Sequence, residues 1–227
     1  MIRLAVSGSE GRMGKRIIDL AGRDGEVEVV SRFDVGIDPG PAIKKCDVLI
    51  EFTTPQATVE HVRMAESAKK AMVIGTTALS DGDIKTIEAC SKNIPIVFSP
   101  NMSVGVNVLF KLCEDAARIL PGGYDVEMSE AHHVHKKDAP SGTAKKLAQI
   151  VAQKRGIEAS GIPVESKREG EIVGDHSVTF DSPTETIELR HSAKTRDTFV
   201  MGAIAAAKFL KGKKNGLYTM RDVLGVK

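Results

Sequence analysis

The fold is set by the opening segment, Ile2-Arg3-Leu4-Ala5-Val6-Ser7-Gly8-Ser9-Glu10-Gly11-Arg12-Met13-Gly14. An apolar strand over Ile2–Ser7 runs into a glycine-rich turn, and helical periodicity predicts a helix over residues 13–23. Glycines in such a turn allow tight bending and close packing of helix on strand. The helix N-terminus then offers unpaired N–H groups to an anion. The segment therefore indicates a parallel α/β sheet with a dinucleotide-phosphate site at its first turn.

The chain outward from this segment continues the alternation of strand and helix. Strands are expected over 27–34, 48–52, 72–74 and 94–98, and helices over 54–70 and 83–92. This pattern is typical of a doubly wound parallel sheet. Beyond Met102 we expect helices over 103–120, 143–155 and 199–210, with strands of a second, more open sheet over 125–129, 176–181 and 186–191. A loop and a short tail are expected to follow the last helix.

We therefore predict an α/β protein with an N-terminal Rossmann-type parallel sheet and a smaller α+β domain. The first domain is expected over 1–102, with the terminal helix and tail, 197–227, returning to it, and the second over 103–196. At 227 residues, with 41% hydrophobic and 27% charged residues, the composition is that of a globular protein. A formal net charge of +2 predicts neither a nucleic-acid nor a membrane partner.

The cysteines and the N-terminus bear on the compartment. Cys46, Cys90 and Cys113 are far apart and lack a CxxC spacing, which disfavours a disulfide framework or a zinc site. The first apolar stretch is too short for a signal peptide, and no apolar run reaches the roughly 18 residues of a membrane span. A cytoplasmic location is therefore expected.

Further residues of the first domain fall where a dinucleotide would bind. Asp34 ends the second strand about twenty residues after the turn, the place of the acidic residue that binds the adenosine ribose. Two further segments follow strands at the sheet edge that binds ligands in open α/β sheets, Gly75-Thr76-Thr77 and Ser99-Pro100-Asn101-Met102. The turn reads GxxGxxG, with Glu10 in place of the usual middle glycine. An ordinary turn with a chance aspartate is the alternative. For the two later segments, the alternative is that they are plain turn residues.

The second domain carries the segment Glu130-Ala131-His132-His133-Val134-His135-Lys136-Lys137-Asp138-Ala139-Pro140-Ser141-Gly142-Thr143-Ala144. The hydroxyls of Ser141 and Thr143 lie beside the first-turn amides of a predicted helix, and Gly142 leaves room for a ligand. With the Lys136 cation these groups form a cradle for a carboxylate or phosphate. Simple N-capping by Asp138 or Ser141 is the alternative.

The three histidines of this segment admit three interpretations. A metal site is disfavoured because no cysteine is near and the lysines would repel a cation. A solvated polar loop and an acid–base site, with neutral His132 beside Lys136, both remain open. Spacing alone does not choose between these two.

Residues 126–144 resemble the signature of the 4-hydroxy-tetrahydrodipicolinate (dihydrodipicolinate) reductase family, E-[IV]-x-E-x-H-x-x-x-K-x-D-x-P-S-G-T-A, with Met128 as the one departure. Residues 6–14, 75–77, 101–107 and 168–176 are also similar to that family. The segment Glu51-Phe52-Thr53-Thr54-Pro55 matches as well, with Glu51 replacing the usual aspartate. The resemblance covers nearly the whole chain, which looks like a compact member shortened between Asp34 and Asp47.

The resemblance implies NAD(P)H-dependent reduction of 4-hydroxy-tetrahydrodipicolinate to tetrahydrodipicolinate, in lysine and diaminopimelate biosynthesis, by a homotetramer. It makes the second domain the substrate-binding and oligomerisation domain. His132 matches the acid/base histidine and Lys136 the proton-donating lysine; His133, Gly142 and Thr143, beside Ser141, match substrate contacts. The dinucleotide site corresponds to Gly8, Ser9, Glu10, Gly11, Arg12, Met13, Asp34, Gly75, Thr76, Thr77, Ser99, Pro100, Asn101 and Met102.

Both NADH and NADPH are expected as cofactors, with NADH preferred, and no metal is expected. Asp34 favours free ribose hydroxyls, while Arg32, on the same face of an extended strand, softens repulsion of a 2′-phosphate. An aspartate or homoserine dehydrogenase is the competing enzyme class. A dinucleotide-sensing protein without turnover is the competing non-enzyme class, although it leaves the histidine–lysine segment unexplained.

Overall fold

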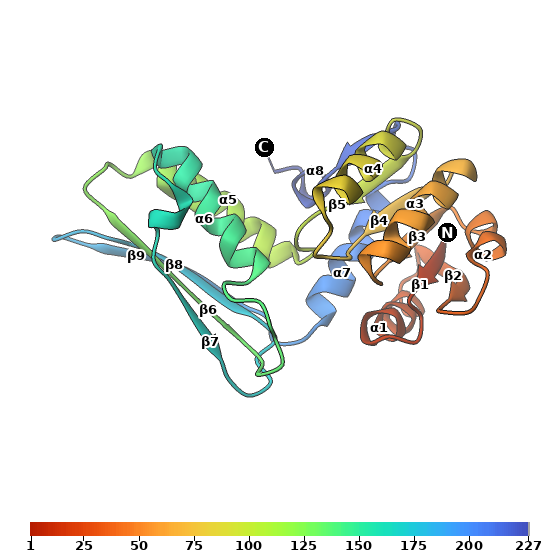
Figure 1. Ribbon diagram of the computed structural model, residues 1–227, viewed down its shortest axis with the longest axis horizontal. Coiled ribbons are helices and arrows are strands. Elements are labelled where there is room, and N and C mark those ends of the chain that lie inside the picture. Colours follow the sequence, from red (N-terminus) through yellow and green to blue (C-terminus); the bar gives the residue numbers. More distant parts are fainter. Residues whose placement is uncertain (227) are drawn as a thin grey trace. The chain divides into compact units, whose positions relative to one another are not determined.

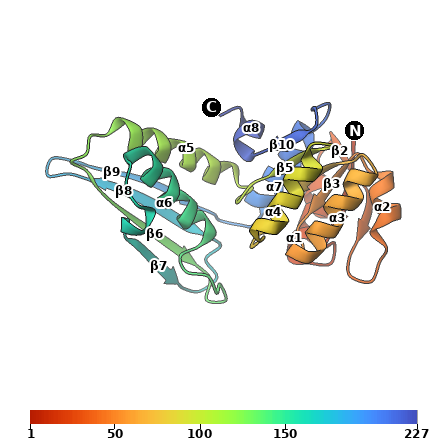
Figure 2. The ribbon, with the colours of Figure 1, turned by 45° about the horizontal axis from the view of Figure 1, so that its top comes forward.

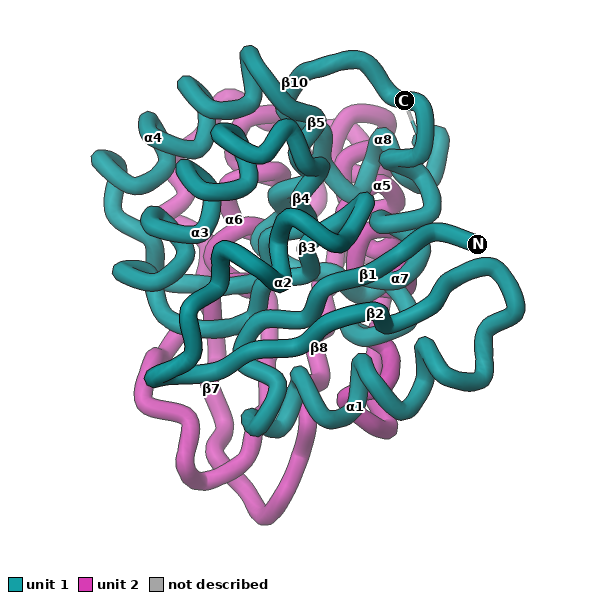
Figure 3. The backbone as a smooth tube through the Cα atoms, turned by 90° about the vertical axis from the view of Figure 1, so that its right-hand side faces the viewer, with its two compact units in different colours: residues 1–103, 199–227 teal, residues 104–198 magenta. Residues whose placement is uncertain are grey.

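The computed structural model describes residues 1–226 and divides them into two compact units, coloured separately in Figure 3. Unit 1 comprises Met1–Ser103 and the described chain from Phe199 onward, and unit 2 comprises Val104–Thr198. The last residue of the predicted range 197–227, Lys227, lies outside the described residues.

Unit 1 is built on a six-stranded sheet in the order β10-β5-β4-β3-β1-β2, whose strand pairings are parallel. The strands are β1 (Ile2–Ser7), β2 (Val27–Phe33), β3 (Val48–Glu51), β4 (Ala71–Ile74), β5 (Pro95–Phe98) and β10 (Gly216–Tyr218). The helices are α1 (Arg12–Ala21), α2 (Pro39–Lys45), α3 (Pro55–Ser67), α4 (Asp81–Ser91), α7 (Asp197–Phe209) and α8 (Met220–Leu224). Figure 1 shows helices on both faces of this sheet.

The alternation of side chains along β1 explains the two layers of helices. Leu4 and Val6 point into one core, which includes Ile17 of α1 and the alanines of α7, whereas Ala5 points into the other, with Val62 of α3 and Ile87 of α4. A strand buried on both faces needs a continuous apolar sequence, and β3 is fully buried.

The second unit holds a four-stranded sheet in the order β7-β6-β8-β9. Its strands are β6 (Asp125–His132), β7 (Val164–Arg168), β8 (Asp175–Asp181) and β9 (Thr186–Ser192); β6 pairs parallel with β7 and antiparallel with β8. The helices α5 (Val104–Ile119) and α6 (Gly142–Arg155) cover one face (Figure 2). Met128, Val178 and Phe180 on that face form the core with Leu109 and Leu147 of the helices.

The predicted α/β class, a Rossmann-type parallel sheet followed by a second α+β sheet, is confirmed. The loop and tail expected after residue 210 are wrong, because β10 and α8 form there, and β10 pairs with the distant β5. Sequence analysis also missed α2 and β7. It ended β6 at Ser129, whereas the strand continues to His132.

Candidate active site

The glycine turn of unit 1 brings backbone atoms unusually close together. Gly8 has a φ of 67°, which favours glycine, and a Cβ there would lie 2.8 Å from the Phe52 carbonyl oxygen. A Cβ on Gly14 would lie 2.1 Å from the Gly8 carbonyl oxygen, so helix α1 packs directly on the turn. Gly11, the N-cap of α1, makes no side-chain cap hydrogen bond. The first-turn amides of α1 are therefore not used by a capping side chain, and the turn fits a dinucleotide phosphate.

Asp34 lies directly after β2 and is anchored to this turn. Its carboxylate accepts hydrogen bonds from the backbone N–H groups of Glu10 at 2.7 Å and Val35 at 2.8 Å. The Glu10 bond is the largest of the effects that lower the pKa of Asp34. An ionised carboxylate is thus fixed beside the glycine turn.

The other predicted dinucleotide residues follow β4 and β5. Gly75 packs against Phe52, since a Cβ there would lie 2.2 Å from the ring, and the Thr76 hydroxyl accepts from the Thr53 N–H at 3.0 Å. Thr77 and Pro100 are exposed, while Ser99 is buried. Asn101 Oδ1 accepts from the Ser103 N–H at 2.8 Å. The side chain of Met102 belongs to the hydrophobic core.

The remaining turn residues differ in exposure: Ser9 is buried, Met13 half-buried, and Glu10 and Arg12 exposed. Under the same sheet edge lies the buried carboxylate of Glu51, with His61 Nδ1 at 2.8 Å. The hydroxyl of Thr58 donates to Glu51 at 3.4 Å, and Ser7 Oγ lies 3.3 Å from His61 Nδ1. These hydrogen bonds hold the end of β3 in place, directly before Phe52 and Thr53, which contact Gly75 and Thr76.

The core of the site in unit 2 is a buried carboxylate, Glu130, on β6. Its side chain is fully buried, and His132 Nδ1, two residues along the same strand face, donates to Glu130 Oε2. Arg168 at the end of β7 binds both carboxylate oxygens, Nη1 to Oε2 at 3.1 Å and Nη2 to Oε1 at 2.9 Å. The Ser141 N–H also donates to Oε1, at 3.2 Å.

Burial and hydrogen bonding shift the pKa values of three residues in this cluster. Burial alone raises the pKa of Glu130, but the hydrogen bonds from Arg168 and His132 outweigh it and hold the pKa below its usual value. Burial lowers the pKa of His132, against the opposing effect of Glu130. Burial also lowers the pKa of His176, on the neighbouring strand β8, to about 4. The site therefore pairs a carboxylate anion with an imidazole that is neutral at pH 7.

The other residues of the histidine–lysine segment surround this cluster. Lys136 Nζ forms an ion pair with Asp138 Oδ1 at 2.8 Å. Ser141 is the N-cap of α6: its hydroxyl accepts from the Ala144 N–H at 3.2 Å and lies 3.2 Å from His176 Nε2. The capping alternative therefore holds for Ser141. Gly142 at the helix start is exposed, and a Cβ there would meet no atom within 4 Å.

The three histidines of this segment differ in solvent exposure. His132 is buried, with 7% of its surface exposed, so the solvated-loop interpretation is wrong for this residue. His133 is half-buried and His135 exposed, and Thr143 is buried at the start of α6. Among the described residues, no group of three or more His, Cys, Asp and Glu side chains is arranged to hold a metal ion.

Sequence analysis gave no role to Glu130, Arg168 or His176. The signal for Glu130 was its i−2 spacing from His132, which places both on one face of a strand. Arg168 and His176 stand at the two ends of a segment that matched the family pattern, residues 168–176. Their contacts with Glu130 and Ser141 depend on the pairing of β6 with β7 and β8, which no local pattern shows.

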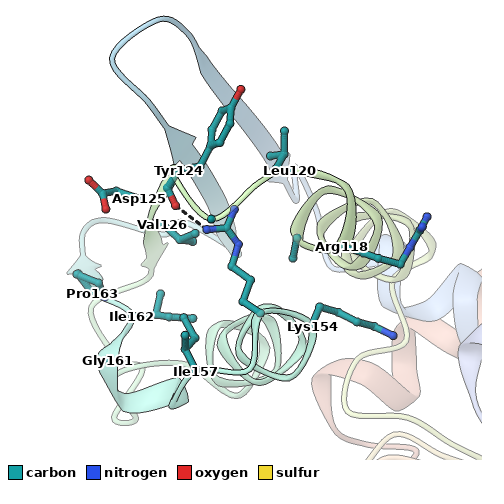
Figure 4. A pocket seen from close by; sticks show the side chains of 13 residues that line it. Arg118, Leu120, Tyr124, Asp125, Val126, Lys154, Ile157, Gly161, Ile162 and Pro163 are labelled. Carbon is teal, nitrogen blue, oxygen red and sulfur yellow. Dashed lines mark hydrogen bonds between the residues drawn. The ribbon is translucent and has the colours of Figure 1, made fainter.

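A cavity of about 630 Å³ lies elsewhere in unit 2. Figure 4 shows its lining side chains, among them Arg118, Tyr124 and Lys154, and the dashed line marks the hydrogen bond from Arg155 to the Tyr124 carbonyl. None of the predicted site residues lines this cavity. The predicted residues of unit 2 lie instead at the end of β6, at the start of α6 and in the loop between them.

Unit 1 has a Rossmann-type parallel sheet, and unit 2 holds a buried carboxylate bonded to an imidazole and a guanidinium. Together they define a nicotinamide-dependent oxidoreductase of two-unit architecture. The chain belongs to the dihydrodipicolinate reductase family: the family model for the N-terminus matches residues 2–102, and that for the C-terminus matches residues 105–224. In the described chain, none of the helices has the length and apolar character to cross a membrane.

The chain is 44% identical over 263 aligned residues to 4-hydroxy-tetrahydrodipicolinate reductase of Aquifex aeolicus, covering 99% of each chain. It is 40% identical over 265 residues to the enzyme of the same name from Aromatoleum aromaticum, covering 100% of this chain and 96% of that one. A solved dipicolinate-bound dihydrodipicolinate reductase from Paenisporosarcina sp. TG-14 superposes with a TM-score of 0.84 at 25% identity, covering 96% and 97% of the two chains.

The competing enzyme class shares the fold only. An aspartate dehydrogenase from Thermotoga maritima matches with a TM-score of 0.54 at 14% identity, covering 94% of this chain and 98% of that one. Membership of the reductase family therefore sets the aspartate dehydrogenase alternative aside.

Proposed function

We propose that this chain reduces 4-hydroxy-2,3,4,5-tetrahydrodipicolinate to tetrahydrodipicolinate with a reduced nicotinamide dinucleotide, as the 4-hydroxy-tetrahydrodipicolinate reductases do. The observation that carries this proposal is the buried Glu130–His132 pair beside Lys136 and the helix start at Gly142. These residues belong to the segment that matches the family signature, and the relatives of this chain are named for this reaction. The lysine and diaminopimelate pathways follow from the same family name.

The acid–base work falls to His132 and Lys136. Reduction of the ring with loss of water leaves negative charge that a proton must neutralise. A carboxylate only accepts hydrogen bonds, so His132 Nδ1 carries a hydrogen toward Glu130 and Nε2 is the atom that exchanges a proton. Lys136, held by Asp138, supplies the proton-bearing cation, and the neutral His132 can accept a proton at Nε2.

The substrate carboxylate is assigned to the start of α6. Gly142 and Thr143 are the first helical residues, and a Cβ on Gly142 would meet only open space. The first-turn N–H groups and the positive end of the helix dipole favour an anion there. His133 is assigned to substrate contact. The dipicolinate in the Paenisporosarcina structure is a dicarboxylate of matching chemistry.

The cofactor is assigned to the carboxyl edge of the unit 1 sheet. The glycine turn and the start of α1 would hold the pyrophosphate, and Asp34 would bind the adenosine ribose. The residues after β4 and β5 would contact the remainder of the dinucleotide. When bound, the reduced nicotinamide supplies the hydride. Residues 1–102, with the returning terminal segment, are thus proposed as the dinucleotide domain and 103–196 as the substrate domain.

We further propose that NADH and NADPH are both used and that NADH is preferred. The anionic Asp34 beside the turn accepts hydrogen bonds from free ribose hydroxyls and repels a 2′-phosphate. Arg32, exposed on β2, softens the repulsion. In steady-state assays kcat/KM should be severalfold higher for NADH, and Asp34→Ala should abolish that preference. A strong NADPH preference in the parent enzyme would contradict this role for Asp34.

A cytoplasmic homotetramer is proposed as the working form. The helices α5 and α6 cover one face of the unit 2 sheet, and the opposite face carries polar side chains such as Glu127, Thr179 and Arg190. That face is available for sheet-to-sheet assembly. Light scattering on the purified protein would give the oligomer mass.

The test of the proposed function is oxidation of NADH in a coupled assay, with the substrate made in place by dihydrodipicolinate synthase. Absorbance at the NADH band should fall only when both enzymes are present. Pyridine-2,6-dicarboxylate, an analogue of the substrate, should inhibit. Binding of NADH without any oxidation would favour the dinucleotide-sensing alternative instead.

A further inference from the structure

The contacts around His132 converge on one cation, Arg168. Its guanidinium binds both oxygens of Glu130, at 3.1 Å and 2.9 Å. Arg168 Nε also donates to the Lys136 carbonyl oxygen at 3.3 Å, and Nη2 donates to that of Asp138. One side chain on β7 is therefore bonded both to the carboxylate behind His132 and to the backbone that carries Lys136.

The carboxylate of Glu130 determines which nitrogen of the neutral His132 ring carries the hydrogen. With a hydrogen on Nδ1 held by Glu130, the lone pair or the exchangeable proton is on Nε2. A Cβ on Gly174 would lie 3.1 Å from His132 Nε2, so glycine keeps this side of the ring uncrowded. The His176 ring packs edge-on against His132, with ring centroids 5.1 Å apart.

We propose that Glu130 and Arg168 are positioning residues of the reductase: Glu130 fixes the His132 tautomer with Nε2 as the proton-exchanging atom, and Arg168 holds Glu130 and the Lys136 backbone in register. This inference rests on the proposed roles of His132 and Lys136. The charged and titratable groups facing His132 are Glu130 on β6, Arg168 on β7, His176 on β8 and Lys136 in the loop; on β9, His191 adjoins His176.

The first experiment replaces Glu130 by Gln and follows His132 by ¹⁵N NMR of histidine-labelled protein without substrate. The parent should show one fixed tautomer with hydrogen on Nδ1. The variant should show mixed tautomers and a lower pKa for His132, because the carboxylate that stabilises the imidazolium is gone. The kcat should fall about 10²-fold, the lower end for a positioned acid or base. A residue of purely structural importance would not shift the tautomer.

A matched control is available on β7. Glu165 is an exposed carboxylate paired with Lys167 at 3.3 Å, so Glu165→Gln removes the same charge from the same sheet. It should leave the His132 tautomer, its pKa and the kcat unchanged.

The second experiment replaces Arg168 by Lys. Lysine keeps the charge but cannot bind two carboxylate oxygens and two carbonyls together. The KM for substrate should rise roughly tenfold, since the Lys136 backbone loses its anchor, while kcat falls less than in Glu130→Gln. If Glu130→Gln fails to fold because Arg168 is left unpaired, Glu130→Gln/Arg168→Met removes both charges and should show the same mixed tautomers.

A fixed Nδ1–H tautomer with an unchanged His132 pKa in folded Glu130→Gln, or in folded Glu130→Gln/Arg168→Met, would overturn the role of Glu130. Parent-like KM in Arg168→Lys would overturn the role of Arg168 in holding Lys136. A parent protein that oxidises no NADH would defeat the proposed function, whereas the tautomer measurement, made without substrate, still decides whether Glu130 fixes His132.

Discussion

The glycine turn of unit 1 and the Glu130 cluster of unit 2 are built from different materials. The turn uses backbone atoms and the absence of side chains, and its parts are neighbours in sequence, from Gly8 to Gly14. The cluster uses a buried carboxylate, a half-buried guanidinium and two buried imidazoles, brought together from three strands. We therefore expect the glycine turn to be sensitive to added side-chain atoms. We expect the Glu130 cluster to be sensitive to the loss or gain of charge.

The largest expected effect comes from removing an acid–base group of the cluster. His132→Gln and Lys136→Ala should each lower kcat by roughly 10²–10⁴-fold while NADH affinity stays intact. Lys136→Ala should also raise KM, since its cation contributes to substrate binding. Steady-state kinetics with His135→Ala, an exposed neighbour, as control would measure this. Near-normal kcat in both variants would remove the cluster from the chemistry.

Charge gained by the cluster should weaken the fold in acid. The pKa of His176 is lowered from 6.5 to about 4, so between these pH values the unfolded chain binds a proton that the folded chain refuses. The free energy of unfolding should therefore fall as pH falls through this window, by about 3 kcal/mol from this residue. Urea unfolding at pH 7 and pH 4 should show a smaller loss in His176→Asn. An equal loss in that variant would mean that other groups control the acid sensitivity; His135→Asn is the matched exposed control.

Atoms added to the glycine turn should weaken cofactor binding without touching the chemistry. Gly8→Ala puts a Cβ at positive φ and 2.8 Å from the Phe52 carbonyl oxygen. The turn must shift, and the NADH dissociation constant should rise roughly tenfold, equivalent to about 1.4 kcal/mol. Calorimetry would measure this, with Gly25→Ala as control, because a Cβ there meets nothing within 4 Å. Equal affinity in Gly8→Ala would show that the turn does not set the cofactor site.

The smallest effect is expected on inhibitor affinity, when atoms are added at a glycine of unit 2. A Cβ on Gly142 meets no protein atom within 4 Å, so Gly142→Val should fold normally and obstruct only a ligand at the helix start. The affinity for pyridine-2,6-dicarboxylate should fall several-fold, on the order of 1 kcal/mol, while NADH affinity is unchanged. Gly122→Val, equally unhindered, is the control. Undiminished inhibitor affinity would move the carboxylate site away from α6.

How far the sequence reached can be seen from β6. The sequence predicted a strand from Asp125 to Ser129, whereas β6 continues to His132 and buries Glu130 and His132, residue types that a core seldom holds. Hydrogen bonds offset the burial of Glu130, which accepts from Arg168, His132 and the Ser141 N–H. Arg168 lies on a strand that was itself missed. In the same way β10 has three residues, too few for a periodic signal, and exists because β5 offers an edge for pairing.

The sequence by itself determined the class of fold, the glycine turn and the family, because strand and helix periods, turn glycines and a long contiguous signature are all local properties. It also located the segment that holds His132 and Lys136. Only the tertiary structure decided that Glu130 lies behind His132, that Arg168 joins this carboxylate to the Lys136 backbone, and that Ser141 caps α6. The physical reason is that burial and pairing of charge depend on which strands become neighbours, and strand pairing is a property of the whole folded unit.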